Sequence, residues 1–356
     1  MNYKITGTGS CIPETIKKNS EFLSNYFFDI DGNQIQSSNI DIVKKLESIT
    51  GINERKYVSD KINSSDLALV AAKNAIEDSK LDQETLDYII VAHNAGDISC
   101  NSSQVDILPS IASRVKTKLK IKNPKCVAYD IICGCPGWVE GMIQAKAFIK
   151  SGMAKKCLVI GSETLSRVSD KNDRDSMIYA DGSGAAILEM DNSNNSGILS
   201  YNSATYTFDG ENEFIYYGAS NNPEHNKKSN KKYIKMQGRK VYEFALTNVP
   251  AAMKDCFDES NCKIENLKKI FIHQANKKMD EAIIKRFFRL YKFSPPEDIL
   301  PMNIEEFGNS SVATIPTLFD LVRKTNYKGH SLTKGDIIMF ASVGAGMNIN
   351  AITYKI

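Results

Sequence analysis

The sequence predicts an α/β fold made of two duplicated halves, each a mixed α/β unit around a central sheet. Helical and strand-like patterns alternate along the chain, and one helix-loop-strand unit of the first half recurs in the second. With 356 residues and 42% hydrophobic composition, the chain is long enough to bury a large core.

The repeated unit begins as a capped helical pattern in residues 65–79 and continues into an apolar strand at residues 88–92. A shift of 181 positions lays residues 71–91 over 252–272 without a gap, and within one position it also lays 157–160 over 337–340. Six of the pairs in 71–91 are identical: Ala71/Ala252, Lys73/Lys254, Ser79/Ser260, Glu84/Glu265, Leu86/Leu267 and Ile89/Ile270. We infer a duplication that divides the chain into residues 1–192 and 193–356, with the active site between them.

Cys135 stands where an apolar run meets a tight turn and a helical pattern begins. Apolar side chains keep helical spacing over residues 139–149, so the thiol is expected at or just before a helix N-terminus. The N–H groups and dipole at that position favour a thiolate, which predicts a pKa lowered from about 8.5 toward or below about 7. Most cysteines are instead inert core residues, and Cys133 is expected to be one of them.

Two further segments carry polar residues after apolar runs. His273 follows the buried strand at 270–272 and precedes a helical pattern that starts at Lys277, although a lone histidine there is often structural. Asn309 follows a glycine at the start of another helix, where it could equally be a simple N-cap. The small-residue turn at 342–347 follows a strand and lets backbone N–H groups approach a ligand closely.

Composition excludes several classes of protein. The N-terminus runs straight into a strand pattern and no apolar stretch is long enough to span a bilayer, so we expect a cytoplasmic protein without a membrane partner. Eight scattered cysteines are then best interpreted as reduced thiols. A net charge of +3 argues against nucleic acid as the main partner. With four histidines and no second cysteine pair at ligand spacing, no metal or other cofactor is predicted.

Two polar stretches interrupt the α/β pattern. Residues 28–34 and the Asn- and Lys-rich residues 221–232 are expected to be surface excursions, and the first could instead form part of a substrate lid.

Together these motifs resemble the β-ketoacyl-acyl-carrier-protein synthase III family of the thiolase superfamily. The resemblance covers nearly the whole chain and rests on ordered blocks at residues 7–14, 50–55, 130–138, 147–152, 180–186, 236–239, 273–276 and 308–311. It implies a thiolase-like fold with the two halves in a layered αβαβα arrangement, and a homodimer. A dinucleotide loop at Gly7 and Gly9 is not favoured, because the fuller glycine pattern is missing.

The resemblance also implies the chemistry. Cys135 would take an acyl group from an acyl thioester, and malonyl on acyl-carrier protein would then lose CO2 and attack it. His273 and Asn309 would donate hydrogen bonds to the enolate, while the N–H groups of Cys135 and Ala345 would form the oxyanion hole, a contribution of roughly 3 kcal/mol per donor. The alternative is an acyltransferase that moves the acyl group to an alcohol or amine, and Asn309 argues for condensation.

Several residues depart from the family pattern, and they make the expected acyl donor and pathway more specific. Lys45 and Ile49 stand where the family has a tryptophan and an arginine against the coenzyme A adenine, while Arg174 keeps the other coenzyme A-side arginine. Carrier-bound acyl groups are therefore expected to be preferred. An insertion before Leu108 alters the acyl tunnel at the dimer interface, and the turn around Ala345 is changed, which suggests a specialised lipid or polyketide-like pathway.

A basic helix is expected to dock the acidic carrier protein. It carries Lys277, Lys278, Lys285 and Arg286 directly after His273, at the position of the family's docking helix. The alternative is an ordinary solvated helix face.

Overall fold

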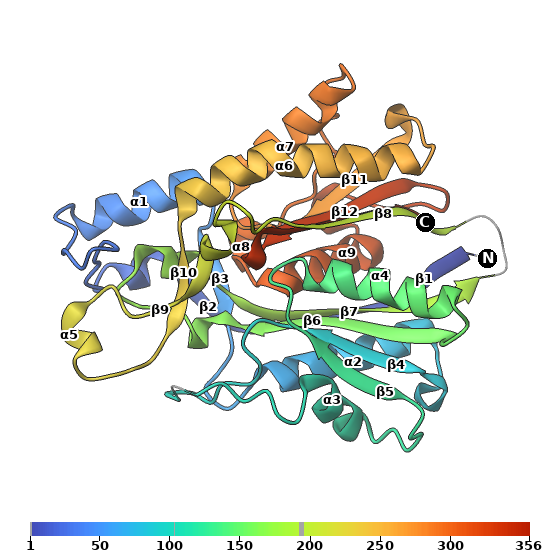
Figure 1. Ribbon diagram of the computed structural model, residues 1–356, viewed down its shortest axis with the longest axis horizontal. Coiled ribbons are helices and arrows are strands. Elements are labelled where there is room, and N and C mark those ends of the chain that lie inside the picture. Colours follow the sequence, from blue (N-terminus) through green and yellow to red (C-terminus); the bar gives the residue numbers. More distant parts are fainter. Residues whose placement is uncertain (1, 103, 192–195) are drawn as a thin grey trace.

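Two main sheets organise the molecule (Figure 1). The structure is a computed structural model and describes residues 2–102, 104–191 and 196–356. The first sheet has the order β1-β7-β6-β4-β5, with strands at Asn2–Cys11, Asp181–Asp191, Lys156–Thr164, Tyr88–Ala92 and Val127–Ile131. The second has the order β11-β12-β13-β8, with strands at Leu267–Ile272, Ile337–Gly344, Asn348–Lys355 and Gly197–Thr205.

Helices lie between the sheets and on both outer faces. The inner pair is α4 (Gly137–Lys150) and α9 (Thr314–Thr325), whose side chains share one core with both sheets. In that core the ring of Phe340 lies 5.5 Å from Trp138 and 5.1 Å from Phe319, centroid to centroid. Such edge-on aromatic contacts add to the burial that joins the layers.

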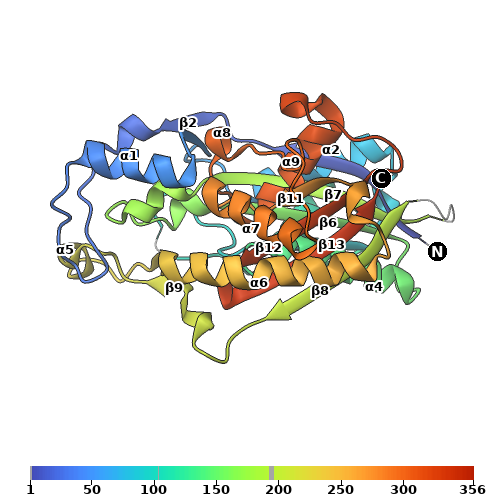
Figure 2. The same cartoon turned by 90° about the horizontal axis from the view of Figure 1, so that it is seen from above.

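Each outer face is covered by its own helix pair. The five-stranded sheet packs against α2 (Ser64–Ser79) and α3 (Ile111–Leu119). The four-stranded sheet packs against α6 (Gly238–Glu259) and α7 (Lys277–Leu290), which lie side by side in Figure 2. The predicted αβαβα layering is therefore confirmed.

The two halves repeat the same local geometry. A helix, a 3-10 turn and a strand follow one another in α2 to β4 and again in α6 to β11. The parallel pair Ile89–Leu158 in the first sheet corresponds to Ile270–Met339 in the second, and both residues of the pair are shifted by the same 181 positions. The proposed boundary at 192/193 lies outside the described residues, between β7 and β8, and the division into two domains stays a prediction.

The remaining elements gather at one end of the molecule, on the left in Figure 1. They are α1 (Asn39–Thr50), α5 (Pro223–Asn226), α8 (Ile304–Phe307), β2 (Thr15–Lys18) paired with β3 (Glu54–Tyr57), and β9 (Ile215–Gly218) paired with β10 (Tyr233–Met236). Short 3-10 helices occupy Asn19–Phe22, Gln83–Thr85, Leu165–Arg167, Arg174–Ile178, Glu211–Glu213, Ile264–Asn266, Ser311–Ala313, Tyr327–Gly329 and Ala345–Met347.

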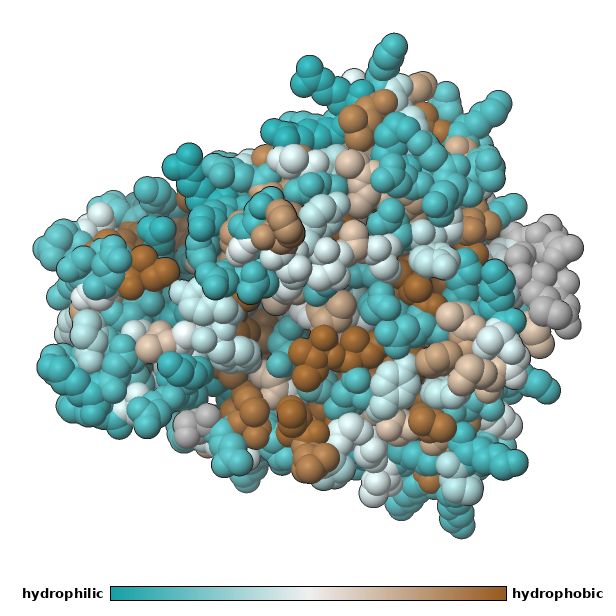
Figure 3. All heavy atoms as spheres, in the orientation of Figure 1, coloured by the Kyte–Doolittle hydropathy of each residue, from teal (hydrophilic) through white to brown (hydrophobic). Residues whose placement is uncertain are grey.

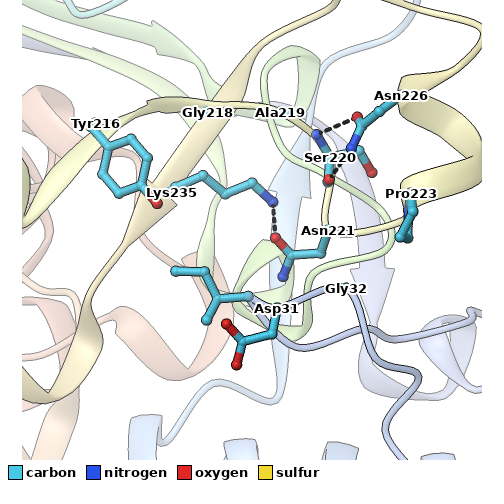
Figure 4. Close-up of a pocket in the computed structure, with 11 residues that line it drawn as sticks. Asp31, Gly32, Tyr216, Gly218, Ala219, Ser220, Asn221, Pro223, Asn226 and Lys235 are labelled. Carbon is cyan, nitrogen blue, oxygen red and sulfur yellow. Dashed lines mark hydrogen bonds between the residues drawn. The ribbon is translucent and has the colours of Figure 1, made fainter.

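The two polar stretches of the sequence meet at this end. The Asn221 side chain donates to the Phe28 carbonyl (3.1 Å), which joins the loop at 28–34 to the segment after β9. Beneath them the buried Lys235 ammonium donates to Asn221 (2.7 Å), as Figure 4 shows. It also donates to Asp170 and Asp173, at 2.6 and 3.1 Å. Three partners satisfy all three ammonium protons, so this cluster is a structural support for the loops.

In the described part of the chain, no helix combines the length and apolarity needed to cross a bilayer.

Candidate active site

Cys135 lies on the turn between β5 and α4. The turn bends at Gly134, whose φ of +62° lies in the left-handed region that glycine tolerates best. Pro136 is the N-cap residue and α4 begins at Gly137. The expectation that the thiol lies just before a helix N-terminus is confirmed.

The predicted pKa of this thiol is wrong in direction. Part of Cys135 remains accessible, but protein surrounds the sulfur, and this burial raises the pKa of the thiol to about 12. A hydrogen bond from Ser311 acts in the opposite direction and is outweighed. The local sequence could reveal the helix N-terminus but not the desolvation of the sulfur. Cys133, expected in the core, is only partly buried.

His273 follows the last residue of β11, and its N–H donates to the Ala341 carbonyl (2.9 Å). The side chain is 4% exposed, and burial lowers the pKa of its imidazole to about 4. The ring is therefore neutral at pH 7. Its Nδ1 shares a 2.8 Å hydrogen bond with the Thr314 hydroxyl, which fixes the orientation of the ring.

Asn309 lies in a buried loop before α9. Gly308 has a φ of +68°, and a Cβ atom there would lie 2.7 Å from the Cβ of Arg55, so only glycine fits. The Asn309 side-chain oxygen accepts from the Ser311 N–H (2.7 Å). Because the oxygen is occupied in this way, the Nδ2 protons are the groups that Asn309 can offer to a ligand.

The contacts of one residue join these three side chains. The Ser311 hydroxyl donates to Cys135 Sγ (3.2 Å), and its N–H reaches Asn309. The Thr314 hydroxyl, which contacts His273, also lies 3.0 Å from the Ser311 carbonyl. Ser311 thus brings Cys135, from the N-terminal part of the chain, together with His273 and Asn309, from its C-terminal part.

The small-residue turn at 344–347 packs directly on the cysteine turn. A Cβ atom on Gly344 would lie 2.6 Å from the Cys135 nitrogen, and one on Gly134 would lie 2.6 Å from the Ala345 nitrogen. The two N–H groups predicted to form the oxyanion hole are therefore on backbones in contact. Asn348 links the two turns, since its Nδ2 donates to the Ala345 carbonyl (2.7 Å) and to the Cys133 carbonyl (3.5 Å).

A cavity of about 940 Å³ opens beside the segment that follows His273. Lys45, Ile49 and Arg174 all line it, so the three residues expected on the coenzyme A side do share one wall. Arg239 and Lys240, in the first turn of α6, line it too. These last two were missed, although the block at 236–239 was among the motifs of the resemblance.

The predicted docking residues lie together on α7 and differ in availability. Lys278, Lys285 and Arg286 are exposed. Lys277 forms an ion pair with Glu305 (2.5 Å), which raises the pKa of the lysine. Arg286 donates to the Leu246 carbonyl (2.8 Å). Two of the four cations therefore already have partners within the chain.

Leu108 lies apart from these groups. It is 86% exposed and projects from the loop before α3, so it does not line an enclosed tunnel within one chain. Its assignment to the acyl tunnel stays a prediction about an assembly of two chains.

No group of three or more His, Cys, Asp or Glu side chains in the described ranges could hold a metal ion.

Comparison with known proteins identifies the family. The family model of 3-oxoacyl-[acyl-carrier-protein (ACP)] synthase III matches residues 129–207, and the model of its C-terminal part matches residues 257–356. The β-ketoacyl-[acyl-carrier-protein] synthase III of Clostridium perfringens is 31% identical, over 100% of this chain and 99% of that protein. The chain belongs to the β-ketoacyl-acyl-carrier-protein synthase III family.

Further relatives agree with this membership. The synthase III of Clostridium acetobutylicum is 33% identical, over 99% of this chain and 98% of its own. The crystal structure of 3-oxoacyl-[acyl-carrier-protein] synthase III from Aquifex aeolicus superposes with a TM-score of 0.79 at 26% identity, over 99% of this chain and 100% of that one. The predicted family and thiolase-like fold are confirmed, and a condensing enzyme of the synthase III type is favoured over the pure acyltransferase.

Proposed function

We propose that this synthase III homologue loads an acyl group on Cys135 and condenses it with malonyl on acyl-carrier protein, releasing CO2. The observation that carries the proposal is the meeting of Cys135, His273 and Asn309 around Ser311, beside backbone N–H groups of two touching turns. A nucleophile, two side-chain donors and an oxyanion site are the groups that this reaction needs.

In the first step the Cys135 sulfur adds to the carbonyl carbon of an acyl thioester. The oxyanion that forms faces the N–H groups of Cys135 and Ala345, and its collapse breaks the carbon–sulfur bond of the donor. The cysteine proton leaves on the released donor thiol, so the step consumes no acid or base.

In the second step carrier-bound malonyl loses CO2, and the enolate carbon attacks the acyl carbonyl on Cys135. Cys135 departs as a thiolate, which a proton from solvent restores to the thiol. His273 and Asn309 stabilise the enolate oxygen as donors. For His273 this requires the proton on Nε2, so the Thr314 hydroxyl must rotate its single proton from the Ser311 carbonyl (3.0 Å) to Nδ1 (2.8 Å) during this step.

We further propose that carrier protein delivers the primer. Lys45 and Ile49 in the cavity wall offer no aromatic face for an adenine. The exposed cations of this region, Lys45, Arg174, Arg239, Lys278 and Lys285, suit an acidic carrier surface. The departures from the family pattern in the turn around Ala345 and at Lys45 and Ile49 support a role in a specialised lipid or polyketide-like pathway. The eight free cysteines agree with a cytoplasmic setting.

The active unit is proposed to be a homodimer formed through β5, the edge strand of the five-stranded sheet. Val127 and Ile132 at its ends are 46% and 67% exposed, and Leu108 is 86% exposed. Figure 3 shows other apolar side chains at the surface of the molecule as well. An exposed edge with apolar neighbours is a ready site for a second copy, which would cover Leu108 and bring it toward an acyl tunnel.

The decisive experiment is a loading and condensation assay. The protein is incubated with acyl thioesters of varied chain length, on carrier protein and on coenzyme A, and the mass added to Cys135 is recorded. Malonyl-carrier protein is then added, and CO2 and the lengthened product are measured. A loaded enzyme that transfers its acyl group to an alcohol or amine, without releasing CO2, would establish the acyltransferase in place of the synthase.

A further inference from the structure

We propose that Ser311 is the positioning residue of this active site. It holds Cys135, His273 and Asn309 in their relative positions, and its hydroxyl donates a hydrogen bond to the Cys135 sulfur. The inference rests on the proposed function of Cys135 as the acylated nucleophile. Ser311 is 3% exposed and lies in the 3-10 helix that precedes α9.

The side chain of Ser311 is oriented by a chain of donors. Its hydroxyl oxygen accepts one proton of the Asn94 amide (2.8 Å) and its own proton points to Cys135 Sγ (3.2 Å). The second proton of the Asn94 amide goes to Glu163 Oε1 (2.5 Å), which also accepts from the Asn94 N–H (2.7 Å). With both amide protons committed, Asn94 acts on Ser311 only as a donor, so the serine proton is turned toward the sulfur.

A hydrogen bond to the charged form of an acid favours that form, so this contact stabilises a thiolate on Cys135. Burial acts against the thiolate, and Ser311 is the hydroxyl that offsets part of that effect. Glu163 is the last member of this series of hydrogen bonds, and burial raises the pKa of its carboxyl to about 8. At pH 7 it is mostly neutral and adds little negative charge near the sulfur.

The backbone of Ser311 reaches the other two groups. Its N–H fixes the Asn309 amide (2.7 Å), and its carbonyl lies 3.0 Å from the Thr314 hydroxyl that contacts His273. These contacts require a φ of +51°, a conformation that a non-glycine residue rarely adopts. Such strain is retained where surrounding contacts over-determine it, and it is typical of functional sites.

The test uses Ser311→Ala, which removes the hydroxyl and keeps a side chain, with Ser310→Ala as the matched control. Ser310 is the preceding residue and is also buried. The rate of Cys135 alkylation by iodoacetamide is followed from pH 6 to 10 by peptide mass spectrometry with the modified residue assigned by fragmentation, because the chain has seven other free cysteines. Because burial raises the pKa of this thiol to about 12, it is mostly protonated throughout this range, and loss of a hydrogen bond to the thiolate should slow alkylation by about tenfold or more at every pH measured. Ser310→Ala should behave as the wild type does.

Asn94→Ala provides a second variant that leaves the strained backbone intact. It should slow alkylation in the same direction and by less, because the serine hydroxyl remains but is free to turn away. This variant carries the test if Ser311→Ala does not fold, as judged by circular dichroism. Wild-type profiles for both variants would overturn the proposal, as would an equal slowing in the Ser310→Ala control. If Cys135 accepts no acyl group even in the wild type, the proposed function fails instead.

Discussion

At the scale of single residues, burial decides the resting state of the site. It raises the pKa of Cys135 and lowers that of His273, so both groups are neutral at pH 7. Because Cys135 and His273 are both uncharged, an anionic malonyl group can enter the site without displacing a counter-ion. The charges that the chemistry creates are then met by donors that are already in place.

The nucleophile can be tested against its neighbour. Cys135→Ala should abolish acyl-enzyme formation, because Cys135 is the thiol that accepts from Ser311 and lies against the turn that carries Ala345. Cys133→Ala should retain it, since the hydrogen bond from Ser311 goes to Cys135. Intact mass after incubation with an acyl thioester is the measurement. Acylation that persists in Cys135→Ala would show that another residue is the nucleophile.

The two donors are expected to serve decarboxylation more than loading. His273→Ala and Asn309→Ala should each keep measurable acylation of Cys135 and lower CO2 release by about 100-fold or more, the usual effect of removing one oxyanion donor. Separate assays of added mass and of CO2 distinguish the steps. A variant that loses loading and keeps decarboxylation would reverse the assigned roles.

Asp280 on α7 predicts a pH-dependent stability. In the described residues neither of its carboxyl oxygens has a hydrogen-bond partner, and burial raises its pKa well above 3.8. The folded state therefore keeps a proton that the unfolded state loses near pH 4, so the stability contributed by Asp280 falls as the pH rises above that value.

Asp280→Leu should remove this effect and raise the free energy of unfolding at pH 7 by about 1–3 kcal/mol. Urea unfolding of both proteins at pH 5 and pH 7 measures the difference, which should be larger at pH 7. Glu297→Leu, at an exposed position after α7, is the control. A difference that does not change with pH would contradict the prediction.

At the scale of elements, α7 combines support and docking. The pairs of Lys277 with Glu305 and of Arg286 with the Leu246 carbonyl tie the helix to its neighbours. Lys278 and Lys285 are exposed and form no ion pair or hydrogen bond in the described part of the chain, so they are the two of the predicted four that are best placed to meet a partner.

Charge reversal on this helix should weaken carrier binding. Lys278→Glu with Lys285→Glu should raise KM for malonyl-carrier protein several-fold at low salt and leave loading from a small synthetic thioester unchanged. The effect should shrink as added salt screens the charges. The control is Lys334→Glu, which changes an exposed lysine in the loop just before β12 begins. An unchanged KM in the double variant would remove α7 from the docking surface.

At the scale of the whole molecule, the proposed duplication would place the site between two similar halves, and β5 lies at one edge of the five-stranded sheet. The five-stranded sheet ends at β5, which also leads into the cysteine turn. Assembly and catalysis are therefore coupled through one short strand in the proposed dimer.

Ile132→Asp tests that coupling. A charge at this 67% exposed position should lower the measured mass in light scattering from a dimer to a monomer and reduce acyl loading. Lys61→Asp, on an exposed loop, should leave both unchanged. A variant that stays dimeric would show that the copies meet through another surface.

The sequence predicted what short motifs and periodicity can express: the layers, the repeated unit, the strand-end position of His273 and the turn before Cys135. It did not reveal Asn94, Glu163 or Ser311 as a connected group, because they are separated by 69 and 217 residues along the chain and meet only after folding. The error in the Cys135 pKa has the same origin. Desolvation is a property of the packed molecule, and a local helix signal cannot measure it.

The N-termini of the two inner helices, α4 and α9, lie next to each other. Cys135 precedes α4, Ser311 precedes α9, and a Cβ atom on Gly137 would lie 3.3 Å from Val312, so the two N-termini meet. Each helix carries about half a positive elementary charge at that end. As the reaction moves negative charge from sulfur to carbonyl oxygen to enolate, the charge stays within one fixed positive potential. That potential belongs to the backbone, so amino-acid substitutions that change the acyl substrate can accumulate around it without abolishing the chemistry.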